Sequence, residues 1–252
     1  MSEGIHRRTT VLWLTGWSMP DAVFDPLRAA LPMYRHAGAD YSAADSPEAI
    51  VGTARAAARA LRSDKDGEAP LLIAGWSLGA LLALRLAAEG LADGLVLMAA
   101  TACFVRPKEQ SGLGWPDPYL RKMLARLGKD RERVLEDFRR GLFTDEEREA
   151  GCESALLAAA PTGVWTADAL AAGLQLLRTE DCRPLLPSIG CPALLIHGTR
   201  DTICPYGAAL ELARLMPRAS LIAAEACGHV PFLRREKEIA EAIRSWNKEL
   251  EA

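Results

Sequence analysis

The sequence has little of what would tie it to a membrane, a nucleic acid or a disulfide scaffold. No apolar run among its 252 residues approaches the ~18 to 20 residues of a membrane span, and residues 1–10 contain no apolar signal core. The net charge of −3 is nearly neutral, which argues against general nucleic-acid binding. The six cysteines form no C-x-x-C pair and no tight framework, so we expect them to be reduced and mostly buried. We therefore expect a cytoplasmic protein that binds neither membranes nor nucleic acids and is a monomer.

The chain has enough hydrophobic residues to form one large core. Hydrophobic residues make up 50% of the 252, and a domain of that length buries on the order of 75% of its unfolded surface without help from a metal or disulfide. Strand-like runs alternate with helical patterns, which predicts a mostly parallel sheet with helices on both faces, an α/β fold. The strand-like runs are 10–15, 70–75, 94–100, 192–197 and 219–224, with a short strand at 37–41, and the helical patterns are about 21–31, 47–62, 78–89, 206–216 and 236–250.

The alternation of strands and helices stops between residues 107 and 187, where charged helical segments dominate. A stretch of that length between two sheet strands cannot be a bare loop in a compact domain. We expect residues 107–187 to form a helical cap over the C-terminal edge of the sheet. Residues 1–106 and 188–252 would then form the α/β core into which the cap is inserted.

The most informative motif is G-x-S-x-G at residues 75–79, centred on Ser77. It directly follows an apolar strand-like run and directly precedes a helix-like run. A serine between two glycines at such a turn is held in a strained backbone conformation, with its Oγ lifted above the sheet. A Cβ at either Gly75 or Gly79 would collide with the neighbouring backbone where the turn is tightest. The motif therefore predicts a nucleophile elbow.

A serine nucleophile needs a histidine base, and the chain offers only four histidines. His6 and His36 lie in polar segments, which predicts solvated surface positions. His197 ends an apolar run, where a hydrogen bond from the ring to backbone is expected. His229 lies in a Gly-containing loop between the last strand-like run and the closing helix. We therefore predict that His229 is the base.

A carboxylate that orients the base is predicted at Asp201. It follows the strand-like run at 192–197, and catalytic groups of open α/β sheets collect at that edge. The chain order Ser77, Asp201, His229 is the order expected of an α/β-hydrolase. The other aspartates considered read as helix caps or surface charges, namely Asp45, Asp168 and Asp181.

The tetrahedral intermediate of acyl transfer needs two backbone N–H donors, an oxyanion hole. Leu78, the residue after the nucleophile, supplies one of them. The loop after the strand-like run at 10–15 supplies the other, and Trp17 is the candidate.

The cap segment carries two sets of candidate binding residues. Phe138 and Phe143 are the best candidates for lining an acyl pocket. Five basic residues are spaced so that they could share one helix face, although that helix can break at Gly128; they are Lys122, Arg126, Lys129, Arg133 and Arg140. Such a face predicts either a solvated, salt-bridged surface or a docking face for a partner.

Several segments together are typical of one family. They are Gly-Trp at 16–17, Gly-Trp-Ser-Leu-Gly at 75–79, Thr-Ala-Cys-Phe at 101–104, the segment 173–185, His-Gly-Thr-Arg-Asp at 197–201 and Gly-His-Val-Pro-Phe at 228–232. On these segments the chain resembles the pimeloyl-acyl-carrier-protein methyl ester esterases of biotin synthesis. One departure is Thr15, which stands where the usual pattern has histidine before Gly16.

The resemblance implies an α/β-hydrolase with a helical cap that hydrolyses the methyl ester of pimeloyl-acyl carrier protein. It implies that Ser77, Asp201 and His229 are catalytic, that the backbone at Trp17 and Leu78 binds the ester oxygen, and that Phe138 lines the acyl channel. It also implies that cap arginines dock the acidic carrier protein, with Arg133 at a matching place. No metal or organic cofactor is required for this chemistry. The alternatives are a broad short-chain carboxylesterase, a carbon–carbon hydrolase or lyase, and a ligand-sensing protein that keeps the triad.

Overall fold

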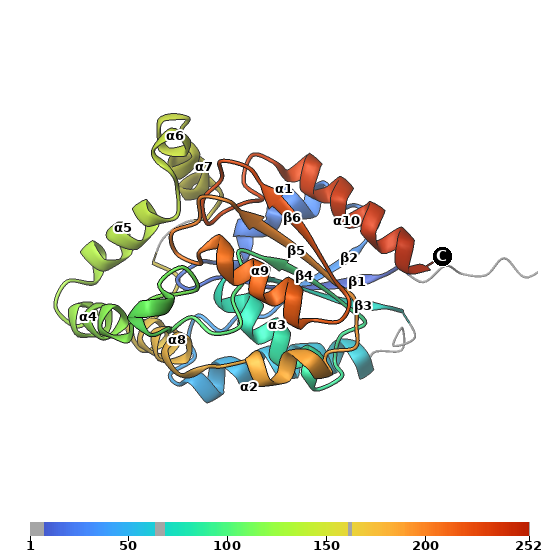
Figure 1. The fold of residues 1–252 in the computed structure, drawn as a ribbon, viewed down its shortest axis with the longest axis horizontal. Helices are drawn as coiled ribbons and strands as arrows, with labels where there is room; N and C mark the ends of the chain where they lie inside the picture. The colour runs from blue at the N-terminus through green and yellow to red at the C-terminus, as the bar shows by residue number, and fades with distance from the viewer. Residues whose placement is uncertain (1–7, 64–68, 161–162, 252) are drawn as a thin grey trace, which may run out of the picture.

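A six-stranded parallel sheet forms the centre of the molecule. The computed structural model describes residues 8–63, 69–160 and 163–251, and the strand order is β2-β1-β3-β4-β5-β6 (Figure 1). Each neighbouring pair of strands is parallel. The strands are β1 (Thr10–Leu14), β2 (Arg35–Gly38), β3 (Leu71–Trp76), β4 (Gly94–Met98), β5 (Ala193–Gly198) and β6 (Ala219–Ala224).

Helices cover both faces of the sheet. On one face lie α1 (Asp25–Ala29) and α10 (Glu236–Glu251), and on the other lie α2 (Pro47–Ser63), α3 (Leu78–Ala88) and α9 (Tyr206–Leu215) (Figure 1). Strands β1, β3, β4 and β5 are buried along their whole length, as expected when both faces of a parallel sheet are covered. Helix α3 is buried nearly all round, which matches its almost wholly apolar sequence. The predicted α/β fold is confirmed.

Two predicted elements have different limits in the structure. The short strand expected at 37–41 is β2 at Arg35–Gly38, so Tyr41 lies beyond it and is buried in the following loop. The helical pattern at 21–31 divides into a 3₁₀ turn (Asp21–Phe24) and α1. Pro26 stands in the first turn of α1, where its missing N–H costs nothing, and so favours a new helix start there.

Between β4 and β5 the described chain forms mainly helices. They are α4 (Asp117–Leu127), α5 (Arg131–Gly141), α6 (Asp145–Glu149), α7 (Cys152–Ala159) and α8 (Ala167–Thr179), with 3₁₀ turns at Lys108–Gln110 and Arg183–Ser188. Helices α4 to α7 extend beyond one end of the sheet, and α8 packs against α4 and α2 (Figure 1). The division of the chain into a core and a cap at 107 and 187 stays a prediction.

The basic residues of this segment do not share one helix. Helix α4 ends at Leu127, and Asp130 begins α5 by accepting a hydrogen bond from the backbone N–H of Arg133 at 3.1 Å. Lys122 and Arg126 therefore belong to α4, and of the two alternatives that the sequence left open, the structure shows an interrupted helix. The break falls at Gly128, a residue that lowers helix stability.

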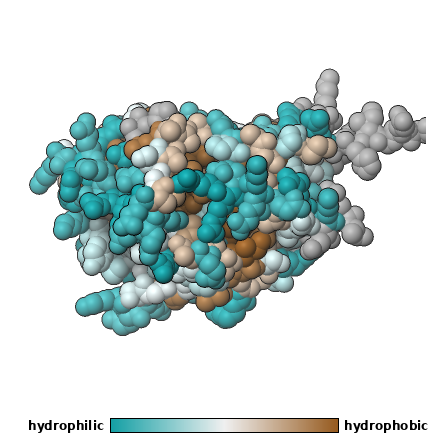
Figure 2. Space-filling model, turned by 90° about the horizontal axis from the view of Figure 1, so that it is seen from above, coloured by the Kyte–Doolittle hydropathy of each residue, from teal (hydrophilic) through white to brown (hydrophobic). Residues whose placement is uncertain are grey.

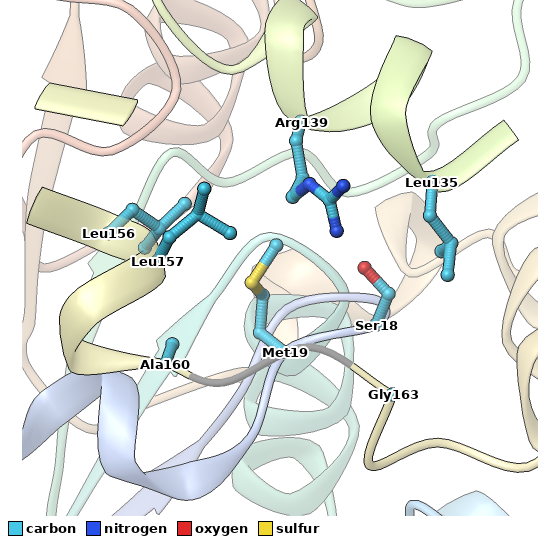
Figure 3. Close-up of a pocket in the computed structure, with 8 residues that line it drawn as sticks. All are labelled: Ser18, Met19, Leu135, Arg139, Leu156, Leu157, Ala160 and Gly163. Carbon is cyan, nitrogen blue, oxygen red and sulfur yellow. The ribbon is translucent and has the colours of Figure 1, made fainter. Parts of the chain in front are cut away.

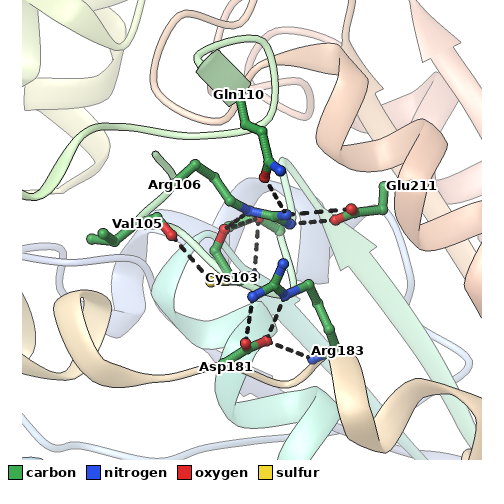
Figure 4. A network of polar contacts seen from close by, with 8 residues as sticks. Cys103, Val105, Arg106, Gln110, Asp181, Arg183 and Glu211 are labelled. Atoms are coloured by element: carbon green, nitrogen blue, oxygen red, sulfur yellow. Dashed lines mark hydrogen bonds and ion pairs between the residues drawn. The ribbon is translucent and has the colours of Figure 1, made fainter. Parts of the chain in front are cut away.

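A buried arginine joins the start of the inserted segment to α9 (Figure 4). The guanidinium of Arg106 pairs with the carboxylate of Glu211, and it also donates to the carbonyl of Cys103 at 3.0 Å. Cys103 forms an isolated antiparallel bridge with Asp181, near the end of the segment, and Asp181 pairs with Arg183 at 2.6 Å. The bridge between Cys103 and Asp181 therefore joins the chain just before the inserted segment to the end of that segment.

Hydrophilic side chains cover most of the face seen in Figure 2, with hydrophobic residues showing between them. All six cysteines are free thiols and five of them are buried, as predicted. Within the residues that the structure describes, no helix is both long and apolar enough to cross a membrane.

Candidate active site

Ser77 occupies the sharp turn between β3 and α3. Its backbone has φ 56° and ψ −116°, a strained conformation for a residue with a side chain. A Cβ on Gly75 would lie 2.4 Å from the carbonyl oxygen of Gly79, and a Cβ on Gly79 would lie 2.0 Å from that of Leu14. The steric prediction for both glycines is therefore confirmed, because only glycine lets the turn approach its neighbours so closely.

Replacement of Gly79 by alanine is expected to destabilise the protein. The added Cβ meets the backbone of β1, which cannot move without disturbing the sheet, so we expect a loss of about 3 kcal/mol or more in the free energy of unfolding. Denaturant unfolding measures the effect. The matched control is Gly52→Ala in α2, where nothing lies within 4 Å of the new Cβ and a gain of about 0.5 to 1 kcal/mol is expected. Equal responses of the two variants would contradict the steric argument.

Three predicted side chains meet in one chain of hydrogen bonds. His229 Nε2 lies 2.8 Å from Ser77 Oγ, and His229 Nδ1 lies 2.7 Å from Asp201 Oδ2. All three residues are buried. They come from the β3–α3 turn, the loop after β5 and the loop after β6, so the parallel sheet brings them to the same edge.

Asp201 is held ionised by its surroundings. Its Oδ1 accepts hydrogen bonds from the backbone N–H groups of Ile203 at 2.8 Å and Cys204 at 2.9 Å. Burial by itself raises the pKa of this carboxyl, but the charge of His229 and hydrogen bonds from His197 and His229 outweigh burial and lower the pKa to about 2. The carboxylate therefore carries its negative charge beside His229 at neutral pH.

The other histidines have different surroundings. His197 is buried, and its Nε2 lies 2.7 Å from the carbonyl of Cys204, which confirms the expected backbone contact. The same nitrogen lies 3.4 Å from Asp201 Oδ2, a neighbour that the sequence did not indicate. The solvated position predicted for His36 was wrong, because its ring is half-buried and its Nδ1 accepts a hydrogen bond from the indole of Trp13 at 3.1 Å. His6 lies outside the described residues.

The predicted oxyanion donors belong to two segments that lie next to Ser77. Leu78 is the first residue of α3, so its N–H has no acceptor within the helix. A Cβ on Gly16 would lie 3.3 Å from Ser77 Cβ, so the loop that continues to Trp17 passes beside the serine. The indole of Trp17 is buried and donates to the carbonyl of Leu170 at 2.8 Å.

Tyr41 braces the start of this loop. Its hydroxyl donates to the carbonyl of Thr15 at 2.6 Å and accepts from the Thr15 hydroxyl at 3.2 Å. Thr15 is the residue that departs from the usual His-Gly pattern, and the structure shows that its side chain is used in a buried contact.

Comparison with known proteins identifies the family of this chain. Residues 11–242 match the model of the alpha/beta hydrolase family. The chain belongs to the alpha/beta hydrolase family.

Two curated relatives of this hydrolase carry the same name. It is 34% identical over 247 residues to a pimeloyl-[acyl-carrier protein] methyl ester esterase of Xanthomonas oryzae, covering 92% of each chain. It is also 37% identical over 172 residues to a protein of the same name from Nitrosomonas europaea, which covers 64% of this chain and 65% of that relative, just under two thirds. The resemblance found in the sequence is confirmed, and the protein is a carboxylic ester hydrolase.

Solved structures show the same fold at lower identity. An esterase from Exiguobacterium antarcticum has a TM-score of 0.77 and 20% identity, covering 97% of this chain and 93% of its own. A bromoperoxidase from Bacillus anthracis has a TM-score of 0.78 and 16% identity, covering 96% and 92%. At such identities the likeness establishes the fold alone.

An apolar pocket of about 290 Å³ lies between α4 and α5 of the hydrolase. Its apolar lining includes Trp115, Tyr119, Met123, Val134, Phe138 and Ile203, and the basic residues Lys122 and Arg126 also line it. Ser77 is not among the lining residues. Two of them reach the triad region, because the ring of Phe138 contacts Trp17 at 4.9 Å between centroids and the N–H of Ile203 donates to Asp201.

A second cavity, on the other side of α5, is too small for a substrate (Figure 3). Its volume of about 10 Å³ has room for about one water molecule. The side chain of Arg139 points toward Met19 and Ser18 there, and its buried Nε has no hydrogen-bond partner in the described structure.

The remaining cap candidates divide between core and surface. Phe143 is buried in the hydrophobic core. Arg133 is exposed and pairs with Glu136 at 3.2 Å and with Asp137 at 3.1 Å, and Arg126 also pairs with Asp137 at 3.3 Å. Lys129 and Arg140 are exposed.

Metal ligands are not grouped near this site. Among the described residues, no cluster of three or more His, Cys, Asp or Glu side chains could hold a metal ion.

Proposed function

We propose that Ser77, His229 and Asp201 form the catalytic triad of this esterase. The observation that carries the proposal is the pair of hydrogen bonds through the His229 ring, 2.8 Å to Ser77 Oγ and 2.7 Å to Asp201 Oδ2. One imidazole nitrogen thus faces a strained nucleophile and the other faces an ionised carboxylate. This is the geometry that serine acyl transfer requires.

The reaction follows from these positions. His229 Nε2 removes the hydroxyl proton as Ser77 Oγ attacks the ester carbonyl, and Asp201 stabilises the imidazolium that forms. The N–H groups of Trp17 and Leu78 donate to the carbonyl oxygen as it becomes an alkoxide. His229 then gives its proton to the leaving alcohol. Water that donates a proton to the same nitrogen attacks the acyl-enzyme and releases the carboxylic acid.

The substrate we propose is the methyl ester of pimeloyl-acyl carrier protein, the ester of biotin synthesis. Support comes from the named relatives, one of which matches 92% of the chain. The pocket between α4 and α5 is an apolar space of the kind an acyl chain needs, at the lower end of the usual size range for ligand sites. An acyl chain in it would reach Ser77 past Phe138, and methanol would be the leaving alcohol.

Two basic residues suit a carrier-bound substrate. Lys122 and Arg126 line the same pocket as the apolar residues, and Asp137, which also lines it, pairs with Arg126. Lys122 therefore supplies the positive charge that an acidic carrier protein seated there would meet as its acyl chain enters. Arg133 is a weaker candidate than its sequence position implied, because Glu136 and Asp137 already offset its charge. Lys129 and Arg140 remain candidates as exposed cations on the same segment.

Reversing the charge of Lys122 and Arg126 together to Glu tests this proposal. Electrostatic steering acts mainly on association, so we expect KM for the carrier-bound methyl ester to rise by about tenfold or more. Hydrolysis of p-nitrophenyl butyrate is expected to stay within about threefold of the wild type, because a small neutral ester gains nothing from steering. Steady-state kinetics with both substrates measures the difference, and moderate salt should weaken the wild type in the same direction.

The matched control carries the same charge change on α10, as Lys237→Glu with Lys248→Glu, both of which are exposed. This control is expected to leave the kinetics of hydrolysis of both substrates unchanged. If the two double variants respond alike, the basic residues of the pocket are only a solvated surface. If the wild type shows no preference for the carrier-bound ester over the free monomethyl ester, the broad short-chain esterase becomes the better assignment.

A further inference from the structure

Glu147 of α6 reaches the loop that carries His229. Its Oε2 accepts a hydrogen bond from the backbone N–H of Gly228 at 3.0 Å, and its Oε1 lies 3.1 Å from the sulfur of Cys227. Burial and the bond to Glu147 raise the pKa of the Cys227 thiol, so the sulfur is protonated and donates. The carboxylate thus binds the two residues immediately before the histidine.

Glu147 is itself fixed by the start of its own helix. Thr144 and Glu147 form a capping box, in which the backbone N–H of Thr144 donates to Glu147 Oε2 at 2.9 Å and the N–H of Glu147 donates to the Thr144 hydroxyl at 3.1 Å. One carboxylate oxygen therefore accepts two backbone N–H groups, one from each segment. The carboxylate of Glu147 therefore links the start of α6 to the loop after β6, so the position of that loop depends on the position of α6.

The residues before α6 touch the same loop. The backbone N–H of His229 donates to the carbonyl of Leu142 at 2.7 Å. A Cβ on Gly228 would lie 2.6 Å from that carbonyl oxygen, 2.9 Å from Glu147 Oε2 and 3.3 Å from Phe143 Cα. Gly228 is therefore pressed against the segment 142–147, with no room for a side chain.

Residues of β3 and of the loop after β5 also hold this loop. The carbonyl of His229 accepts from the indole of Trp76 at 2.8 Å, and the carbonyl of Cys227 accepts from the N–H of Arg200 at 2.9 Å. With its backbone held by both sets of contacts, the loop keeps the imidazole of His229 at its two hydrogen-bond distances from Ser77 and Asp201.

We infer that Glu147 is a positioning residue for His229, acting through the backbone of Cys227 and Gly228. The inference rests on the proposed role of His229 as the base. Without the carboxylate, the N–H of Gly228 and the thiol of Cys227 lose their acceptor, and the loop can shift away from the inserted segment. A base displaced by about 1 Å from its partner can cost on the order of 10²-fold in rate.

The test compares Glu147→Ala, Glu147→Gln and Thr144→Ala with p-nitrophenyl butyrate, a substrate that needs no carrier protein. Glu147→Ala is expected to lower kcat by about 10- to 10²-fold with little change in KM, and to slow fluorophosphonate labelling of Ser77 by the same factor. Glu147→Gln keeps a side-chain oxygen that can accept from Gly228, so it should restore most of the lost kcat. Thr144→Ala removes the other half of the capping box but leaves the bond to Gly228, so its kcat should stay within about threefold of the wild type.

Each measurement is made below the thermal unfolding temperature of the variant, so that loss of folded protein does not lower kcat.

Wild-type kcat in Glu147→Ala would overturn the inference. Equal losses in Glu147→Ala and Thr144→Ala would also overturn it, since capping of α6 would then explain both. Ser77→Ala is measured alongside these variants, and activity or labelling that survives in it refutes the proposed triad. If Ser77→Ala is inactive but Glu147→Ala keeps wild-type kcat, only the positioning role of Glu147 is refuted.

Discussion

Replacement of Ser77 by alanine is expected to lower kcat for ester substrates by about 10⁶-fold, the scale on which removal of a serine nucleophile acts. The variant keeps the backbone of the elbow but has no Oγ for His229 Nε2 to deprotonate. His229→Ala should lose a similar factor, because it leaves Ser77 without a base. The double variant should be little worse than either single variant, since both residues serve one step.

Covalent labelling checks the nucleophile independently of kinetics. A fluorophosphonate should add one mass increment to the peptide that contains Ser77, and Ser77→Ala should remain unlabelled. Labelling that persists in the variant would assign the nucleophile elsewhere. Fully additive losses in the two single variants would show that Ser77 and His229 do not act in the same step.

The parts of the site that the sequence predicted are those with local signals. Ser77 is flanked by two glycines, each two positions away, and the structure confirms that a side chain at either glycine would collide with neighbouring backbone. Asp201 and His229 each follow a strand-like run, and a parallel sheet must bring such loops to one edge. Chain order and the sheet rule were therefore enough to select the three side chains that the structure brings together.

The residues that the sequence did not indicate act across long distances in the chain. Glu147 lies among Asp145, Glu146 and Glu149, and nothing local separates it from these neighbours. Its partner Gly228 is 81 residues away, and no periodicity connects the two. The capping-box pattern of Thr144 and Glu147 was the one available signal, but it predicts a helix start rather than a contact with the histidine loop.

Burial explains the other differences. His36 lies in a short edge strand where the sequence looks polar, but the indole of Trp13 on the neighbouring strand needs a buried acceptor and finds it there. His197 was expected to bond to backbone, and it also approaches Asp201, four residues further along the chain. Tyr41 sits beyond the end of β2, and its hydroxyl is satisfied by Thr15. The contacts of His36 and Tyr41 join segments that become neighbours only in the folded sheet.

Asp201 is buried, yet several groups stabilise its charged form. Two backbone N–H groups bind Oδ1, and His229 binds Oδ2. Since the folded-state pKa is lowered from 3.8 to about 2, the stability gained from this ionisation is fully present above pH 3.8 and is lost as the pH falls through about 2. At neutral pH the carboxylate is therefore available both to orient His229 and to stabilise its cation.

Asp201→Asn is expected to lower kcat by up to about 10⁴-fold while changing folding and KM little. The amide oxygen can still accept from Ile203 and Cys204, so the loop should keep its shape. The amide nitrogen then faces His229 Nδ1 as a donor, which moves the imidazole proton to Nε2, where it blocks removal of the Ser77 proton. Steady-state kinetics, with circular dichroism to verify folding, measures the effect.

Asp40→Asn is the matched control, because Asp40 also accepts a backbone N–H, from Ser42 at 2.9 Å, but lies outside the triad. Near-wild-type kcat in Asp201→Asn would assign the orienting carboxylate to another residue, and an equal loss in Asp40→Asn would attribute the effect to a general response to losing a loop carboxylate.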